Sequence, residues 1–124
     1  MMKVVIINGT NGETSRVNGV QRYIEQRLPE VTSIEVYKLP AQALITVDGA
    51  HDEVIAANAK VAEAAAVIVL TPVYQAAYSG ILKAYLDLIP QKGLKGKTVL
   101  PIAVGGSSHH LLMIEYALKP VLSV

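Results

Sequence analysis

Four short stretches of the chain are almost continuously apolar and rich in β-branched residues: 4–7, 34–37, 67–70 and 99–104. Strands that are covered on both faces have this composition, as in parallel sheets. Apolar residues at helical spacing lie between them, in residues 17–28, 54–62 and 81–89, and prolines follow the first and third of these segments. Strand and helix therefore alternate, which predicts an α/β fold of the flavodoxin-like type: an open parallel sheet with helices on both faces.

The whole chain, residues 1–124, is interpreted as one domain. Residues 40–51 are the longest connection without a helical or strand pattern, and they are predicted to be irregular, either a surface loop or part of a subunit contact. Four strands are few for this fold, and the last predicted strand has no following strand to pair with. We expect that edge to be covered either by a last strand and helix absent from this sequence or by a partner chain.

Composition narrows the classes of partner. Charged residues make up 17% of the chain and its formal net charge is +1, so no basic face for nucleic acid is predicted. The absence of cysteine excludes disulfides, a thiolate nucleophile and sulfur-ligated metals. The longest apolar run, residues 64–70, is far shorter than the roughly 20 residues of a membrane span. We expect a cytoplasmic protein that binds small molecules or other proteins.

Ligands of open α/β sheets bind beyond the carboxyl ends of the strands. The segment that follows the first predicted strand is rich in glycine and hydroxyl groups and leads into a helix, whose free N–H groups favour an anion such as a monophosphate. Its candidate binding residues are Gly9, Thr10, Thr14, Ser15, Arg16 and Asn18. A purely structural interpretation stays open, in which the glycines shape a turn and Ser15 only caps the helix.

Two further loops follow the third and fourth predicted strands. Pro72, Val73 and Tyr74 place a rigid turn and an aromatic ring at the predicted ligand edge, unless Tyr74 merely packs on Tyr78. The segment "GGSSHH" offers close backbone approach to a flat ligand and donors at a helix start, through Gly105, Gly106 and Ser107. Adjacent histidines point in different directions, so His110 is predicted to pack or hydrogen-bond at the helix start and no metal is expected.

These segments together resemble a known family. The stretches "GT…TSR", "TPVYQAAYSGILKAYLDLIP", "LKGKTVLPIAVGGSSHHLL" and "YALKPVLS" are similar to the NAD(P)H-dependent FMN reductases, in particular to the flavin reductases of bacterial alkanesulfonate monooxygenase systems. The resemblance implies an FMN site, with the phosphate in the first loop and the ring between the second and third. It also implies a reduced nicotinamide donor, NADPH or NADH, and delivery of reduced FMN to a monooxygenase.

The resemblance further implies a homodimer or homotetramer, with a π-helical widening at Tyr116 near the subunit interface. Pro120 gives this a physical reason, because it has no N–H for the carbonyl of Tyr116. The alternative is an ordinary proline kink with Tyr116 in the core.

Two other functions stay open: a quinone or azo-compound reductase that keeps FMN bound, and a non-enzymatic electron-transfer module, which would be expected to be strongly acidic. A phosphoacceptor receiver domain is excluded, because Asn8 and Thr71 stand where it needs acidic residues.

Overall fold

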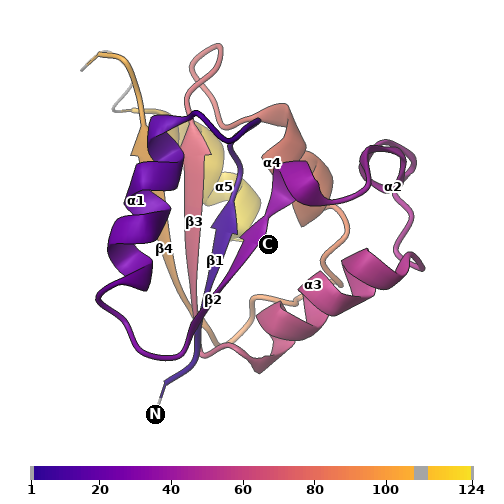
Figure 1. Ribbon diagram of the computed structural model, residues 1–124. Coiled ribbons are helices and arrows are strands. Elements are labelled where there is room, and N and C mark those ends of the chain that lie inside the picture. Colours follow the sequence, from indigo (N-terminus) through magenta and orange to yellow (C-terminus); the bar gives the residue numbers. More distant parts are fainter. Residues whose placement is uncertain (1, 108–111, 124) are drawn as a thin grey trace.

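The computed structural model describes residues 2–107 and 112–123. Within them, helices and strands alternate as the hydrophobic pattern predicts (Figure 1). The strands are β1 (Val4–Asn8), β2 (Val31–Glu35), β3 (Ala66–Pro72) and β4 (Thr98–Val104). The helices are α1 (Arg16–Glu25), the 3₁₀ turn η1 (Val36–Lys38), α2 (Ala41–Thr46), α3 (Asp52–Glu63), α4 (Gly80–Leu86), the π-helix η3 (Ile114–Leu118) and α5 (Lys119–Leu122).

The four strands form one parallel sheet in the order β2-β1-β3-β4. In the register, Asn8 at the end of β1 lies between Glu35 of β2 and Leu70 of β3, and Pro72 at the end of β3 lies beside Val104. The carboxyl ends of all four strands therefore meet at one edge of the sheet. The fold class predicted from the sequence is confirmed, and within the described residues β4 is an edge strand.

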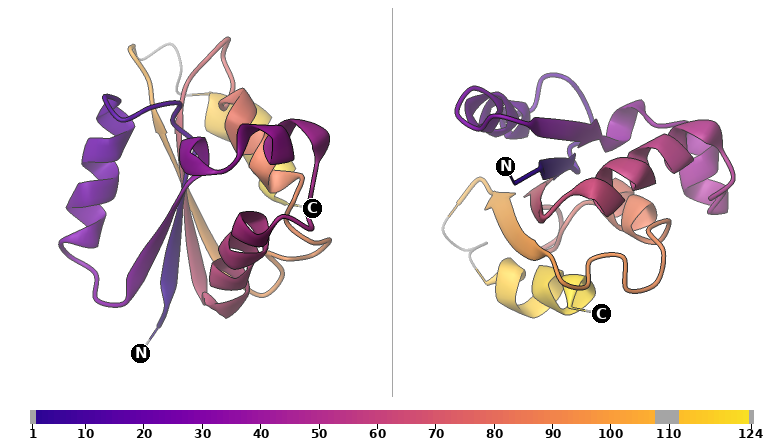
Figure 2. Two further views of the ribbon diagram at one scale, coloured as in Figure 1. Left: turned by 45° about the vertical axis from the view of Figure 1, so that its right-hand side comes forward. Right: turned by 90° about the horizontal axis from the view of Figure 1, so that it is seen from below.

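Two apolar clusters cover the two faces of the sheet, because alternate residues of each strand point to opposite sides. Ile6 and Leu70 pack with Val17 of α1 on one face. On the other face, Val5 and Val69 belong to the larger cluster, which includes residues of α2, α3, α4 and η3. Figure 2 shows α1 alone on its side of the sheet and α3 and α4 on the other. No helix of the described residues is long and apolar enough to cross a membrane.

One buried polar contact joins α3 to α4. The hydroxyl of Tyr85, a fully buried residue, donates to Oδ1 of Asn58 at 2.9 Å, and Nδ2 of Asn58 donates to the carbonyl of Leu88 at 3.0 Å. Burial raises the pKa of Tyr85 strongly, because the phenolate would lie in an apolar environment. The neutral phenol is therefore the form that this core accommodates.

Two sequence-based predictions are corrected by the structure. The strand predicted at residues 34–37 is Val31–Glu35, and Val36–Lys38 forms a 3₁₀ turn. Polar Thr32 and Ser33 concealed its beginning, since an edge strand tolerates polar residues. The segment predicted to be irregular, residues 40–51, contains the six-residue helix α2, which buries Ala43 and Leu44 against the larger cluster.

The widening predicted at Tyr116 is confirmed. Residues Ile114–Leu118 form a π-helix, in which the N–H of Lys119 donates to the carbonyl of Ile114, five residues earlier. The side chain of Tyr116 is 78% exposed, so it does not lie in the core. The alternative of a simple proline kink around a buried tyrosine is therefore wrong.

The environment of Tyr85 predicts how stability responds to alkaline pH. Its pKa is raised above the ordinary value of 10.0, so the unfolded chain loses this proton first. Stability is thus fully present below pH 10 and is lost as pH rises above it. We expect Tyr85→Phe to lower the free energy of unfolding by about 1 kcal/mol at neutral pH, because the hydrogen bond to Asn58 is lost. Above pH 10, the free energy of unfolding should decline less steeply in the variant than in the wild type. Urea denaturation between pH 7 and 11 checks this, and parallel pH curves for both proteins would contradict it.

Candidate functional site

The loops after β1, β3 and β4 lie together at the carboxyl edge of the sheet, at the top of Figure 1. The first loop is joined to β3 by the N–H of Gly9, which donates to the carbonyl of Leu70 at 2.8 Å, and to the second loop by the hydroxyl of Ser79, which donates to the carbonyl of Gly9. The third begins at Val104, the register partner of Pro72. The structure therefore brings together the three segments in which the sequence predicted ligand-binding residues.

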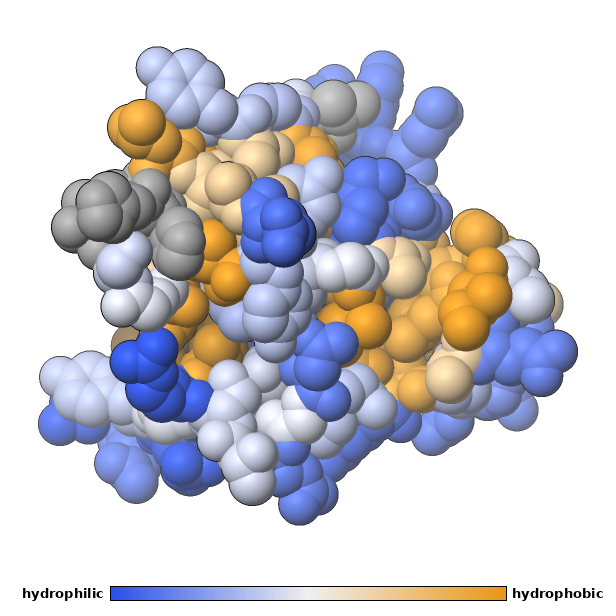
Figure 3. All heavy atoms as spheres, turned by 90° about the horizontal axis from the view of Figure 1, so that it is seen from above, coloured by the Kyte–Doolittle hydropathy of each residue, from blue (hydrophilic) through white to orange (hydrophobic). Residues whose placement is uncertain are grey.

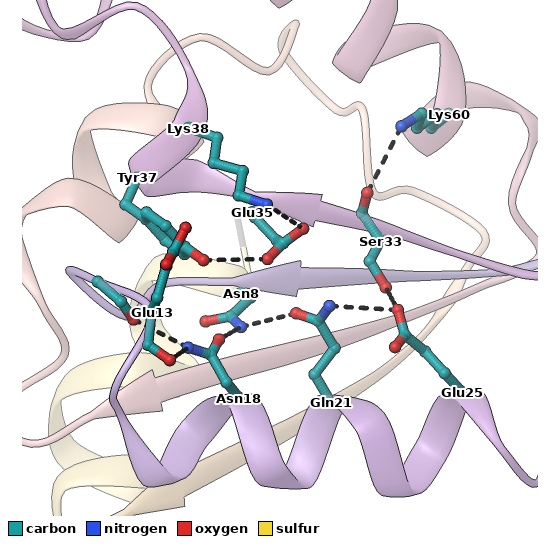
Figure 4. A network of polar contacts seen from close by, with 11 residues as sticks. Asn8, Glu13, Asn18, Gln21, Glu25, Ser33, Glu35, Tyr37, Lys38 and Lys60 are labelled. Carbon is teal, nitrogen blue, oxygen red and sulfur yellow. Dashed lines mark hydrogen bonds and ion pairs between the residues drawn. The ribbon is translucent and has the colours of Figure 1, made fainter.

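A buried hydrogen-bond network holds the first loop from beneath (Figure 4). Nδ2 of Asn8 donates to Oδ1 of Asn18 at 2.8 Å and to Oε1 of Gln21 at 2.7 Å, while its Oδ1 accepts from the N–H of Thr10 at 2.9 Å. All four of these residues are at least nine-tenths buried. Asn8 thus ties the end of β1 to two turns of α1 and to the loop between them.

Asn18 completes the network and has a different role from the predicted one. Its Nδ2 donates to the carbonyls of Gly12 and Glu13, at 2.9 and 3.0 Å, while its Oδ1 accepts from Asn8. Both polar ends of the amide are therefore engaged within the protein. Asn18 shapes the loop from inside, and its predicted contact with a ligand stays a prediction.

Ser79 locks the second loop onto the first. Its hydroxyl donates to the carbonyl of Gly9 and accepts from the N–H of Leu82, so it also caps α4. Its own N–H donates to the hydroxyl of Thr71 at 3.0 Å. A Cβ on Gly9 would lie 2.8 Å from Cβ of Leu82 and 3.1 Å from the carbonyl of Leu70, so only glycine fits this crossing. Local sequence patterns did not reveal Ser79 as a link between loops 70 residues apart.

The anion-binding candidates lie at the start of α1. Ser15 caps the helix by accepting from the N–H of Val17 at 3.1 Å, and Thr14 and Arg16 are exposed. Thr10 differs from them: it is 1% exposed, yet its hydroxyl makes no hydrogen bond within the described chain. A buried hydroxyl without a partner is uncommon because it loses its hydration without compensation. At the start of the ten-residue helix, the N–H groups of Val17 and Asn18 both donate to Ser15, and that of Arg16 makes no hydrogen bond within the described residues.

The second loop presents Tyr74 on a tight turn. Tyr74 and Ala77 exchange both backbone hydrogen bonds, at 2.9 and 3.0 Å, around Gln75 and Ala76. These two residues have φ values of 50° and 60°, the left-handed region that glycine or asparagine usually occupies. Pro72 is buried, Val73 packs on the larger core cluster, and the side chain of Tyr74 is 49% exposed. Tyr74 is thus held at the edge by a turn with unfavourable backbone angles.

The third loop has an accessible backbone. Gly105 is half-buried, and Gly106 and Ser107 are exposed. A Cβ on Gly106 would meet no atom of the described residues within 4 Å, so its backbone is open to an approaching group on that side. His110 lies outside the described residues, and among those described no group of three or more histidine, aspartate or glutamate residues could hold a metal ion.

Seen from above, polar and apolar side chains are interspersed over this edge, and a further group of apolar side chains lies on the side of α2 (Figure 3). Ile45 and Val47 of that region are 81% and 56% exposed. Exposed apolar residues of the α2 region therefore lie on this side of the molecule.

The sheet order and the glycine-containing loops at its carboxyl edge define the class, a doubly wound α/β protein of the flavodoxin-like type. Within that class, residues 2–124 match the family model of NADPH-dependent FMN reductases, and the chain belongs to this family. It is 43% identical to an FMN reductase (NADPH) of Pseudomonas putida KT2440 and 40% identical to one of Escherichia coli K12, in both cases over 98% of its length.

A solved structure supports the same assignment. The apo form of an NADH:FMN oxidoreductase superposes with a TM-score of 0.91 at 35% identity, over 98% of this chain and 68% of that one. The present chain spans 64% and 66% of the two curated relatives. The family is thereby shown, together with the fold of the part that the chain contains.

The crossing at Gly9 gives a stability prediction. Gly9→Ala forces its Cβ against Leu82 and the Leu70 carbonyl, and we expect it to lower the free energy of unfolding by about 1–3 kcal/mol. Gly12→Ala is the matched control in the same loop, since no atom lies within 4 Å of its added Cβ. Thermal or urea unfolding of both variants measures the difference. Equal effects would show that the loops do not cross as closely as the structure indicates.

Proposed function

We propose that this chain forms the FMN site of an NAD(P)H-dependent FMN reductase. The observation that carries the proposal is the buried hydroxyl of Thr10 in the loop that leads into α1, which has no hydrogen-bond partner among the described residues. A bound phosphate would give that hydroxyl an acceptor and would also accept from the N–H of Arg16 at the start of the helix. The family membership of the chain supports the same ligand.

The residues around the loop fit a monophosphate. Ser15 and Thr14 place hydroxyl groups at the start of α1, and Arg16 adds one positive charge there. Gly9 keeps the loop against β3, and Asn8 fixes its first amide. A phosphate held in this way needs no metal ion, because amides, hydroxyls and one guanidinium suffice for an anion at a helix start.

The flavin ring belongs beyond the strand ends, between the second and third loops. Pro72, Val73 and Tyr74 would border one side of it, and Gly105, Gly106 and Ser107 the other. The cofactors supply the chemistry, a hydride passing from the nicotinamide to the flavin. The protein then has to position two flat rings, exclude water and offer backbone donors, and it needs no acid–base pair. The exposed ring of Tyr74 and the open side of the Gly106 backbone suit that task.

The reduced nicotinamide that donates the hydride and the enzyme that receives reduced FMN are inferred from the family, as part of this proposal. The relatives include enzymes named for NADPH and a 29% identical one from Pseudomonas putida named for NADH, so either nicotinamide is a candidate donor. We propose a flavin-dependent monooxygenase as the acceptor of reduced FMN and the cytoplasm as the location.

Two exposed apolar residues near the C-terminal end favour an oligomer. Leu112 and Tyr116 lie four residues apart and are 65% and 78% exposed, which favours a homodimer or homotetramer with the Tyr116 helix at its interface.

Nicotinamide oxidation tests the proposed activity. We expect NADPH or NADH to be consumed only when FMN is added, at a rate that saturates with the FMN concentration, because flavin is a substrate that exchanges. Absorbance at the nicotinamide band, with and without flavin, measures this. A protein that remains yellow after purification and reduces quinones without added FMN would instead be a quinone reductase.

Thr10→Val separates ligand binding from folding. The substitution removes a hydroxyl that has no partner among the described residues, so we expect the free energy of unfolding to stay constant or rise by up to about 1 kcal/mol. FMN affinity should fall by about tenfold or more, while riboflavin, which lacks the phosphate, is bound as before. Thr32→Val, on the exposed part of β2, is the control. Fluorescence titration with FMN and with riboflavin measures both affinities. An equal loss of affinity for the two flavins would mean that Thr10 does not contact the phosphate.

A further inference from the structure

The carboxyl end of β2 carries a charged cluster directly beside the proposed phosphate loop. Glu35, the last residue of β2, is the register partner of Asn8, the residue from which that loop begins. Tyr37 and Lys38 follow in the 3₁₀ turn η1, and Figure 4 shows their side chains on the same side as Glu13. We call Glu13, Glu35, Tyr37 and Lys38 the β2-end cluster.

Glu35 holds two members of the β2-end cluster in place. One carboxylate oxygen accepts from the hydroxyl of Tyr37 at 3.2 Å, and the other lies 3.4 Å from Nζ of Lys38. The ammonium is 5.8 Å from the centre of the Tyr37 ring. Glu35 raises the pKa of Lys38, so this side chain stays positively charged at neutral pH. It remains more than half exposed and is therefore accessible to a ligand in the adjoining loop.

Glu13 brings the opposite charge from the loop itself. Its backbone is fixed, because its carbonyl accepts from Asn18, and its carboxylate forms no hydrogen bond or ion pair within the described residues. Its charge nonetheless acts on another member of the cluster. The pKa of Tyr37 is raised by burial, by Glu35 and more weakly by Glu13. Glu13 is therefore a carboxylate in the loop proposed to hold a phosphate, turned toward the end of β2.

We propose that Glu13 and Lys38 are opposed specificity residues that set how tightly the phosphate of the flavin is held. This rests on the proposed function. A flavin phosphate carries almost two negative charges at neutral pH, so Glu13 repels it and Lys38 attracts it, whereas uncharged riboflavin feels neither. The β2-end cluster holds two carboxylates against one ammonium, and its net charge of −1 weakens binding. A reductase that has to release reduced FMN benefits from this limit on affinity.

Glu13→Gln tests the repulsion. We expect it to tighten FMN binding by about three- to tenfold, the effect of one exposed charge near a dianion, and to leave riboflavin affinity unchanged. Glu13→Asp keeps the charge and should behave like the wild type. The difference in FMN affinity between Glu13→Gln and the wild type should shrink as salt is raised from about 20 mM to about 500 mM, because salt screens solvent-exposed charges. Fluorescence titrations of the full chain with both flavins measure all of these.

Lys38→Met tests the attraction and should act in the opposite direction. We expect it to weaken FMN binding by a similar factor and to leave riboflavin binding unchanged. Glu63→Gln is the matched control, since it changes the net charge like Glu13→Gln but lies at the opposite edge of the sheet, 3.9 Å from Lys3. The inference is overturned if Glu13→Gln leaves FMN affinity unchanged, shifts both flavins equally, or matches Glu63→Gln. If the wild type binds no FMN at all, the proposed function fails first, which separates the two failures.

Discussion

The carboxamide of Asn8 is the interaction on which the rest of the site depends. It lies at the end of a fully buried strand, between β2 and β3, where no water is available to replace a missing hydrogen bond. All of its described contacts serve the segment that follows: two to α1 and one to the amide of Thr10. Leaving any of these groups unpaired would cost about 1–3 kcal/mol, so strand, loop and helix are fixed relative to one another.

Much of the fold was predictable because burial leaves a local trace. β1 and β3 are buried on both faces, and each appears in the sequence as an apolar run. β4 appears as an apolar run too, although it is an edge strand whose residues are only partly buried. β2 is an edge strand, where Thr32 and Ser33 are tolerated, and its beginning was missed for that reason. Helix α2 is only six residues long and follows Pro40, so its periodicity is too short to recognise.

The site was predictable as a set of loops but not as a set of contacts. Glycine, serine and threonine after each strand indicated loops that the structure does bring together at one edge, and Ser15, predicted to bind a ligand with helix capping as the alternative, caps α1. The roles of Asn8, Gln21 and Ser79 were missed because each depends on a partner 10, 13 or 70 residues away. Asn18 was assigned to a ligand on its residue type alone, whereas its amide is engaged within the loop.

The site thus contains two kinds of polar residue. Buried amides and Ser79 build the loop, and changing one of them disturbs the backbone that positions the others. Glu13 and Lys38 lie outside this network, and the loop does not rely on their charges for its shape. Thr10 differs from both groups, since it is buried like the amides but its hydroxyl has no partner in the part of the chain that the structure describes. In such an arrangement the buried network fixes the shape of the loop, while the exposed charges of Glu13 and Lys38 can change without altering that shape.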